Sequence, residues 1–313
     1  MSEFDLIRRY FTRATPGAVL GVGDDAALLQ PTAGNVLAVS TDMLVSGTHF
    51  FADADPFLLG HKTLAVNLSD LAAMGATPRW ATLALSLPAA DEVWLELFSA
   101  GFFALAQQHD VDLVGGDTTR GPLNLCVTIF GEVPPQLALR RSGAQVGDDI
   151  WVSGSLGDAA LALAHLQGRI ALDEIAFAAC AQHLHQPQPR VELGLALRGI
   201  ANSAIDVSDG LLADLGHILE CSNVGAEIAF DMLPVSQALR SCSQQKLALS
   251  GGDDYELCFT VSAVRAAEVR AIAERLELPL TRIGKIVAHH GCIVHDASGN
   301  AINIETEGYD HFR

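Results

Sequence analysis

The sequence lacks the features that mark several common protein classes. None of its six cysteines forms a CxxC pair, and only 19 basic residues stand against 37 acidic ones. No apolar run reaches the ~18 residues that a membrane-spanning helix needs, and the start, MSEFDLIRRYFTR, has no apolar core of a secretion signal. A net charge of −18 repels nucleic acid and anionic lipid. We therefore expect no membrane and no nucleic acid as partner.

The cysteines are scattered, and several lie in apolar runs such as NLCVTIF and ELCFTV. A free thiol in such a run behaves as a small hydrophobic side chain. Free thiols are typical of a reducing compartment, so we expect a cytoplasmic protein.

Familiar catalytic signatures are also missing. The chain contains no GxxxxGK[ST] phosphate loop, no HRD-type kinase loop and no GxSxG elbow. No cysteine has a suggestive partner residue, so nucleophilic catalysis has no visible carrier.

What is present is a long alternation of apolar, β-rich runs with helical patterns, which predicts an α/β architecture. Half the residues are hydrophobic and 18% are charged, which excludes a disordered chain. Val133-Pro134-Pro135 interrupts the alternation, because two successive prolines resist both helix and central strand. We place a domain boundary there, giving domains of residues 1–136 and 137–313.

Local signals predict two helices in the first domain. Asp55 can cap a helix that begins at Pro56 and stops near Met74-Gly75. A second helix is expected from about Asp91 to Gln108. Strands are expected around them, including the runs AVLGVG in the first domain and LALSGG in the second.

The most informative pattern is the position of the aspartates. Six apolar runs end in small residues followed by Asp: GVGDDAA, AVSTDML, AVNLSDL, LVGGDTTR, AIDVSDG and LSGGDDYE. The third looks helical, and its Asn67 and Asp70 would share one helix face. Ligand sites in α/β proteins form at the carboxyl ends of strands.

Carboxylates gathered without matching basic residues repel one another, and a hard cation such as Mg²⁺ with phosphate oxygens removes that repulsion. Each motif alone is more simply a turn or a helix cap, and Asp148-Asp149 is best interpreted as a turn that enters a strand. Their repetition at element ends favours a phosphate site with several metal ions.

Two other features leave alternatives open. The segment GSLGDAALAL could offer backbone N–H groups to a phosphate at a helix start, or could be a tight turn before good helix formers. The histidine pairs at 183/185 and 289/290 lie in polar stretches and are expected at the surface, whereas His49 stands out because it closely follows STDMLVSGT.

Longer strings in a fixed order resemble the thiamine-monophosphate kinases, within the superfamily of aminoimidazole ribonucleotide synthetase. They include STDMLVSGTHF, KTLAVNLSDLAAMGA, GGDTTRGPL, SAIDVSDGLLADLGH and LSGGDDYELCFTV, and they cover essentially the whole chain. One departure is visible, because Asp253 stands where that family usually has Glu.

The resemblance implies a two-domain aminoimidazole ribonucleotide synthetase-like fold, a homodimer whose N-terminal domains pair their strands into a barrel, and a C-terminal domain that completes the active site. It also implies that several Mg²⁺ ions, ATP and thiamine monophosphate bind. The implied magnesium ligands are Asp25, Ser40, Thr41, Asp42, Asp70, Asp117, Asp206 and Asp209. The implied ATP contacts are Gly116, Asp117, Arg141 and Ser208, and the implied contacts with the thiamine substrate are His49, Asp253 and Tyr309.

The activity implied is in-line transfer of a phosphate from ATP to thiamine monophosphate, and no residue is implied as a chemical catalyst. Without the resemblance, Arg141 would be interpreted as a solvated linker charge. The alternatives are a sister enzyme of the same superfamily with another acceptor, and a non-catalytic protein that binds divalent cations. Selenophosphate synthesis is disfavoured, because no cysteine precedes Cys126.

Overall fold

The computed structural model describes residues 2–303 and divides the chain into two compact units. The N-terminal unit comprises residues 1–71 and 76–136, and the C-terminal unit comprises residues 72–75 and 137–313. Tyr309, a predicted substrate contact, lies outside the described residues. None of the helices among residues 2–303 is long and apolar enough to cross a membrane.

A mixed four-stranded sheet forms the centre of the N-terminal unit. Its order is β1-β4-β2-β3, with β4 antiparallel to both neighbours and β2 parallel to β3. Along β4, buried and half-buried side chains alternate, which is typical of a strand with one fully covered face. The strands are β1 (Val36–Val45), β2 (Thr77–Leu87), β3 (Asp112–Arg120) and β4 (Asn124–Val133).

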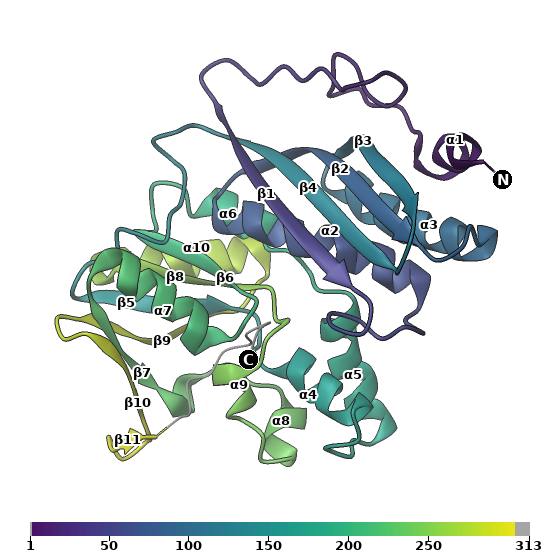
Figure 1. Cartoon of the computed structure of the whole chain (residues 1–313). Helices are drawn as coiled ribbons and strands as arrows, with labels where there is room; N and C mark the ends of the chain where they lie inside the picture. The colour runs from purple at the N-terminus through teal and green to yellow at the C-terminus, as the bar shows by residue number, and fades with distance from the viewer. Residues whose placement is uncertain (1, 304–313) are drawn as a thin grey trace. The chain divides into compact units, whose positions relative to one another are not determined.

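The two long helices of this unit begin where the sequence predicts. In α2 (Pro56–Ala73) the Asp55 carboxylate accepts the backbone N–H of Leu58 at 3.0 Å. In α3 (Glu92–Gln108) the Asp91 carboxylate accepts two N–H groups of the first turn. Both helices lie behind the four strands in Figure 1. A short helix, α1 (Glu3–Leu6), and a π-helical turn, η1 (Ile7–Phe11), precede the sheet.

Two glycines let α2 and α3 approach backbone to backbone. A Cβ added at Gly60 would lie 2.1 Å from the Phe98 carbonyl oxygen, and one at Gly101 would lie 1.9 Å from the Phe57 carbonyl oxygen. Such separations are far inside van der Waals contact, so both positions require glycine.

The face of the sheet that α2 and α3 leave uncovered is apolar along β1. Val39 and Met43 are each 55% exposed, and Leu37 lies two residues before Val39 on the same face. Val39 pairs with Phe130 of β4, whose side chain is half-buried. We call Leu37, Val39, Met43 and Phe130 the open apolar face.

The C-terminal unit is built on a mixed seven-stranded sheet of order β11-β10-β7-β9-β5-β8-β6. Side chains of its central strands and of the helix after β6 form one core cluster, which includes Ile150, Val152, Leu215 and Ile218. The strands are β5 (Asp148–Ser153), β6 (Ser203–Val207), β7 (Gly225–Ala229), β8 (Glu256–Ser262), β9 (Leu280–Val287), β10 (Gly291–His295) and β11 (Ala301–Ile302).

The helices of this unit divide into those that pack on the sheet and a smaller group. Helix α7 packs on β6 and α10 on β9, whereas α4 and α5 enclose a second small core with α8. The helices are α4 (Asp158–Leu166), α5 (Glu174–His185), α6 (Val191–Ala196), α7 (Leu211–Ser222), α8 (Gln237–Ser241), α9 (Leu247–Ser250) and α10 (Ala266–Leu276), with 3-10 turns η2 (Phe230–Met232) and η3 (Ala263–Arg265).

Two of the predicted strands are wrong. The run AVLGVG forms only isolated bridges, such as Leu20 with Leu28, because its two glycines stand in a loop with no continuous partner strand. The run LALSGG begins as the short helix α9, so Asp253 and Asp254 precede β8 rather than follow a strand. Both errors arise from short apolar runs, whose periodicity does not separate helix from strand.

Candidate metal and phosphate site

Asp42 of β1 and Asp70 of α2 form an acidic pair in the N-terminal unit. Burial, together with the charge of Asp70 and a hydrogen bond to it, raises the pKa of Asp42 to about 7. The Ser40 hydroxyl donates a short hydrogen bond to Asp70 Oδ2. The Asp42 backbone N–H donates to Asn67 Oδ1 at 3.3 Å, so Asn67 and Asp70 share one face of α2 as predicted.

Thr41 lies on the other face of β1. Successive side chains of a strand alternate between faces, and the Thr41 hydroxyl lies 2.9 Å from the Thr128 hydroxyl of β4. Ser40 and Asp42 therefore meet Asp70 on the helix-covered face, whereas the hydroxyl of Thr41 does not join them.

Gly116 and Asp117 occupy adjacent rows of the same sheet on β3. Asp42, Val127, Leu83 and Gly116 are paired in one row across the four strands. Gly116 has φ +153°, and a Cβ there would lie 1.9 Å from the Leu83 carbonyl oxygen, so only glycine fits.

Asp117 lies in the next row of paired residues across the four strands, and that row ends at Met43 of β1. The alternation of side chains places Asp117 with Thr41 on the open side of the sheet. The predicted ligands of the N-terminal unit are thus divided between its two faces.

Asp25 and His49 lie in loops on either side of β1. Asp25 is exposed, and its N–H donates to the Asp24 carboxylate at 3.0 Å, a turn interaction. His49 Nδ1 accepts the backbone N–H of Val45 at 3.0 Å. That bond closes the turn after β1 and leaves the proton of a neutral imidazole on Nε2.

In the C-terminal unit, β6 and the turn after it carry Asp206, Ser208 and Asp209. Asp214, in the first turn of α7, accepts the backbone N–H groups of residues 208, 209 and 210 at 3.0, 3.1 and 3.1 Å. Burial raises the pKa of Asp214 to about 7, although these backbone N–H groups oppose that shift.

The loop before β8 turns one aspartate outward and buries the next. Asp254 accepts the N–H of Gly157 with both carboxylate oxygens at 2.9 Å, and burial raises its pKa well above the usual range. Its neighbours Asp253 and Tyr255 both have left-handed backbones, with φ of +68° and +50°. The Tyr255 hydroxyl donates to Asp253 Oδ1 at 3.0 Å.

This loop bears on the alternatives for GSLGDAALAL. The N–H of Gly157, the residue before α4, is occupied by Asp254, a carboxylate of the chain itself, which favours the tight turn over a phosphate site at that N–H group. Gly157 itself has φ +88°.

Arg141 has an exposed side chain on the segment that leads to β5, and its backbone carbonyl accepts the Ser222 hydroxyl.

The sequence patterns did not point to Asp214 or Tyr255. A carboxylate in the first turn of a helix often accepts backbone N–H groups of the turn before it. Asp214 stands four residues after the Asp-Gly pair, so this signal could have identified it. Nothing in the string GGDDYE indicates that the tyrosine hydroxyl turns back on Asp253.

Asp148 and Asp149 are buried at the start of β5, directly after a turn, in line with their interpretation as a turn that enters a strand.

The acidic pair in the N-terminal unit fits a hard divalent cation. Among residues 2–303 no cluster of three or more His, Cys, Asp or Glu side chains is ready to hold a metal ion. Mg²⁺ does not require one, because it is commonly held by one or two carboxylates together with substrate phosphates and waters. Two facing carboxylates, of which Asp42 has a raised pKa, and a nearby hydroxyl offer such a set.

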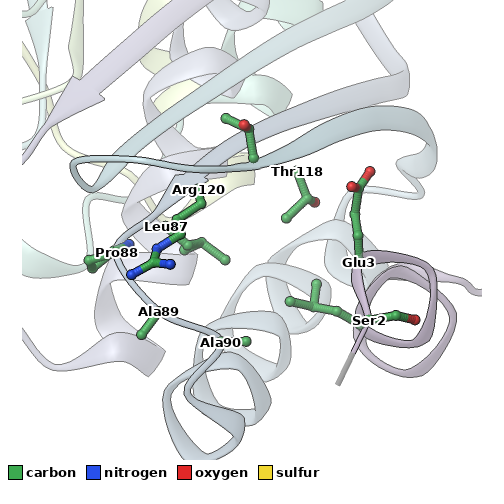
Figure 2. A pocket seen from close by; sticks show the side chains of 10 residues that line it. Ser2, Glu3, Leu87, Pro88, Ala89, Ala90, Thr118 and Arg120 are labelled. Atoms are coloured by element: carbon green, nitrogen blue, oxygen red, sulfur yellow. The ribbon is translucent and has the colours of Figure 1, made fainter.

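A pocket of about 370 Å³ lies at the carboxyl ends of β2 and β3, against α1 (Figure 2). Leu6, Leu87 and Pro88 give it apolar walls, and Arg120 places a guanidinium at its edge. Arg120 lies three residues beyond Asp117, on the strand that carries two of the predicted ATP contacts.

Comparison with known proteins identifies both units. Residues 23–133 match the N-terminal domain of AIR synthase related protein, and residues 145–297 match its C-terminal domain. The thiamine-monophosphate kinase of Escherichia coli O157:H7 is 49% identical over 321 residues, covering 99% of this chain and 98% of the relative.

Solved structures agree with this assignment. A crystal structure of thiamine-monophosphate kinase from Stenotrophomonas maltophilia K279a has a TM-score of 0.85 and 54% identity, covering 96% of each chain. AaThiL complexed with AMPPCP and TMP has a TM-score of 0.78 and 31% identity, covering 99% of this chain and 96% of the other. The chain therefore belongs to the thiamine-monophosphate kinase family, with the two-domain fold of the AIR synthase related proteins.

Proposed function

We propose that the chain transfers the terminal phosphate of ATP to thiamine monophosphate, giving thiamine diphosphate and ADP. The observation that carries this proposal is near-complete coverage by relatives named thiamine-monophosphate kinase, among them the E. coli O157:H7 protein at 49% identity. The Asp42–Asp70 pair adds a site suited to Mg²⁺, the usual cofactor of such kinases.

The proposed metal-binding set remains Asp25, Ser40, Thr41, Asp42, Asp70, Asp117, Asp206 and Asp209. Gly116, Asp117, Arg141 and Ser208 are proposed to contact ATP, and His49 and Asp253 to contact thiamine monophosphate, together with Tyr309. Thr41 is included in this set, although its hydroxyl lies on the open side of the sheet.

The chemistry requires positioning more than activation. An oxygen of the acceptor phosphate, already anionic near neutral pH, attacks the γ-phosphorus of ATP, while the bond to the β–γ bridging oxygen breaks and ADP leaves with the electron pair. Mg²⁺ held by Asp42 and Asp70 would supply positive charge that offsets the repulsion between the two anions. The exposed Arg141 guanidinium can bind a phosphate with two donors.

The test is ATP consumption by the purified protein with Mg²⁺, with and without thiamine monophosphate, while chromatography follows thiamine diphosphate. We expect equal amounts of ADP and thiamine diphosphate, and no product after chelation. ATP binding without thiamine diphosphate would instead indicate a sister enzyme with another acceptor. Cation binding without ATP binding would indicate the non-catalytic alternative.

Replacing Tyr255 by Phe tests the role of Asp253. The change removes the hydroxyl that holds the Asp253 carboxylate but keeps the ring. Losing one hydrogen bond to a charged group is expected to raise the KM for thiamine monophosphate roughly three- to tenfold, with a smaller change in kcat. Steady-state kinetics at saturating ATP measure both constants.

The matched control is Tyr10→Phe. The Tyr10 hydroxyl is buried and makes no hydrogen bond with any residue between positions 2 and 303. Its removal should leave the KM unchanged. Equal KM values for Tyr255→Phe and wild type would remove Asp253 from the substrate contacts.

We also propose that the chain forms a homodimer through the open apolar face. A second copy is the favoured occupant, because an exposed, sheet-borne apolar patch on this unit can be buried by the same patch of a partner. Strands paired across such an interface can close a barrel, as the family resemblance implies.

The six cysteines are all free, which supports a reducing, cytoplasmic location.

The double substitution Val39→Asp and Met43→Asp should convert the dimer to a monomer, because it would bury four carboxylates in the interface. Light scattering after size exclusion measures the mass. Val264→Asp is the control, since Val264 is 89% exposed in the C-terminal unit. A monomeric wild type, or a double variant that remains dimeric, would contradict this interface.

A further inference from the structure

The turn between β6 and α7 carries two predicted contacts of the active site. We call residues Ser208, Asp209 and Gly210 the 208–210 turn. The hydroxyl of Ser208 is a predicted ATP contact, and Asp209 is a predicted metal ligand. Gly210 has φ +120°, and a Cβ there would lie 2.9 Å from the backbone of Ser250, so the turn is closely packed where it enters the helix.

Three consecutive N–H groups of this turn converge on one oxygen atom. Asp214 Oδ2 accepts them at 3.0, 3.1 and 3.1 Å, and Asp214 is only 3% exposed. Successive N–H groups that point inward make a concave site for an anion. Here the chain's own carboxylate fills that site, so these N–H groups are not offered to a phosphate.

The opposite side of the same segment is held by the loop before β8. The N–H of Asp253 donates to the Ser208 carbonyl at 2.9 Å, and the N–H of Tyr255 donates to the Val207 carbonyl at 2.8 Å. Asp214 binds the donors of the segment and the loop binds its acceptors. The backbone that carries Ser208 and Asp209 is therefore fixed from both sides, independently of any ligand.

We propose that Asp214 is a positioning residue, which holds the 208–210 turn in the conformation that presents Ser208 and Asp209 to metal-bound nucleotide. This proposal rests on the proposed function. Residues that orient metal ligands without touching the metal commonly change metal affinity or activity about 10- to 100-fold when replaced. Asp214 is neither a ligand nor a base in this assignment.

The test compares Asp214→Asn with Asp214→Leu. Asparagine keeps one side-chain oxygen that can accept the three N–H groups, whereas leucine has a similar size and no acceptor. The measurements are kcat, the KM for ATP, the Mg²⁺ concentration at half-maximal activity, and the rise in Tm on adding Mg²⁺ with ATP. We expect Asn to stay within about threefold of wild type and Leu to raise the Mg²⁺ requirement at least about tenfold.

Asp158→Leu is the matched control. Asp158 is 1% exposed and also stands in the first turn of a helix, but it accepts the hydroxyls of Ser155 and Ser236 and, within residues 2–303, no N–H group of a predicted site residue. It should lower Tm while leaving the Mg²⁺ requirement unchanged. If Asp214→Leu does not fold, Asp214→Ser is measured instead, because serine is small and cannot reach all three N–H groups.

A folded Leu or Ser variant with a wild-type Mg²⁺ requirement would overturn the proposal. An equal rise in the Asp158 control would overturn it too, because the effect would then be one of general stability. The Tm measurement separates this failure from failure of the proposed function. A wild type that forms no thiamine diphosphate still reports, through Tm, whether Asp214 governs binding of Mg²⁺ with ATP.

Discussion

Replacing Asp42 by Asn is expected to lower turnover at least about a hundredfold while making the metal-free protein more stable. The turnover falls because one of the two facing carboxylates of the proposed metal site loses its charge. The stability rises because burial and Asp70 disfavour the ionised form of Asp42, and asparagine has a similar shape without that charge.

The stabilisation should depend on pH in a defined direction. The pKa of Asp42 is about 7 in the folded chain, above the ordinary value of 3.8. The folded state thus binds the proton more tightly, and the wild type loses stability as pH rises from about 4 to about 7. The advantage of Asp42→Asn is absent below pH ~4 and complete above pH ~7, on the order of a few kcal/mol.

Thermal melts with chelator at pH 4, 6 and 8 measure this advantage, and the same melts with Mg²⁺ and ATP should reverse it. Asp117→Asn is the companion variant, because Asp117 is also a predicted ligand but lies on the opposite face of the sheet; it should likewise lower turnover. Near-normal turnover in Asp42→Asn would contradict the ligand set. An Asp42→Asn variant that is less stable than wild type at pH 8 would contradict the expected stabilisation by removal of the buried charge.

Gly101→Ala is expected to destabilise the N-terminal unit by at least about 3 kcal/mol, the second large effect. The new methyl group would lie 1.9 Å from the Phe57 carbonyl oxygen, so α2 and α3 must separate. Because α2 also carries Asp70 and Asn67, we expect a loss of activity at temperatures where the unit remains folded. Circular dichroism melts and activity after brief heating measure the two effects.

Gly216→Ala is the control for Gly101→Ala. Gly216 lies inside α7, and a Cβ there would meet no atom of the described residues within 4 Å. Alanine at this position should stabilise the protein by about 0.5–1 kcal/mol, because it favours the helix over the unfolded chain. A similar loss of stability in both variants would show that the helix crossing is not the cause.

Strong local signals made part of the fold predictable. Asp55 with Pro56, and Asp91 ahead of a long apolar helix, fixed the starts of α2 and α3, because a cap requires only neighbouring residues. The strand predicted at residues 247–252 is wrong because so short an apolar run does not reveal its period, and its first four residues form α9.

The candidate site was predictable to a lesser degree. The aspartate motifs led to Asp42 and Asp70, yet the alternation along β1 already separates Thr41 from Ser40 and Asp42. In the paired aspartates 253 and 254, no local signal tells which carboxylate turns inward. The answer depends on Gly157, almost a hundred residues earlier in the chain.

The left-handed backbone at Asp253 bears on which side chains evolution can place there. Asp, Asn and Gly adopt positive φ more readily than longer side chains do. A Glu on this backbone would gain reach at the expense of backbone strain, whereas the shorter acid of this chain fits the left-handed conformation and is held by the Tyr255 hydroxyl. Backbone geometry thus accounts for Asp at this position without a change of ligand.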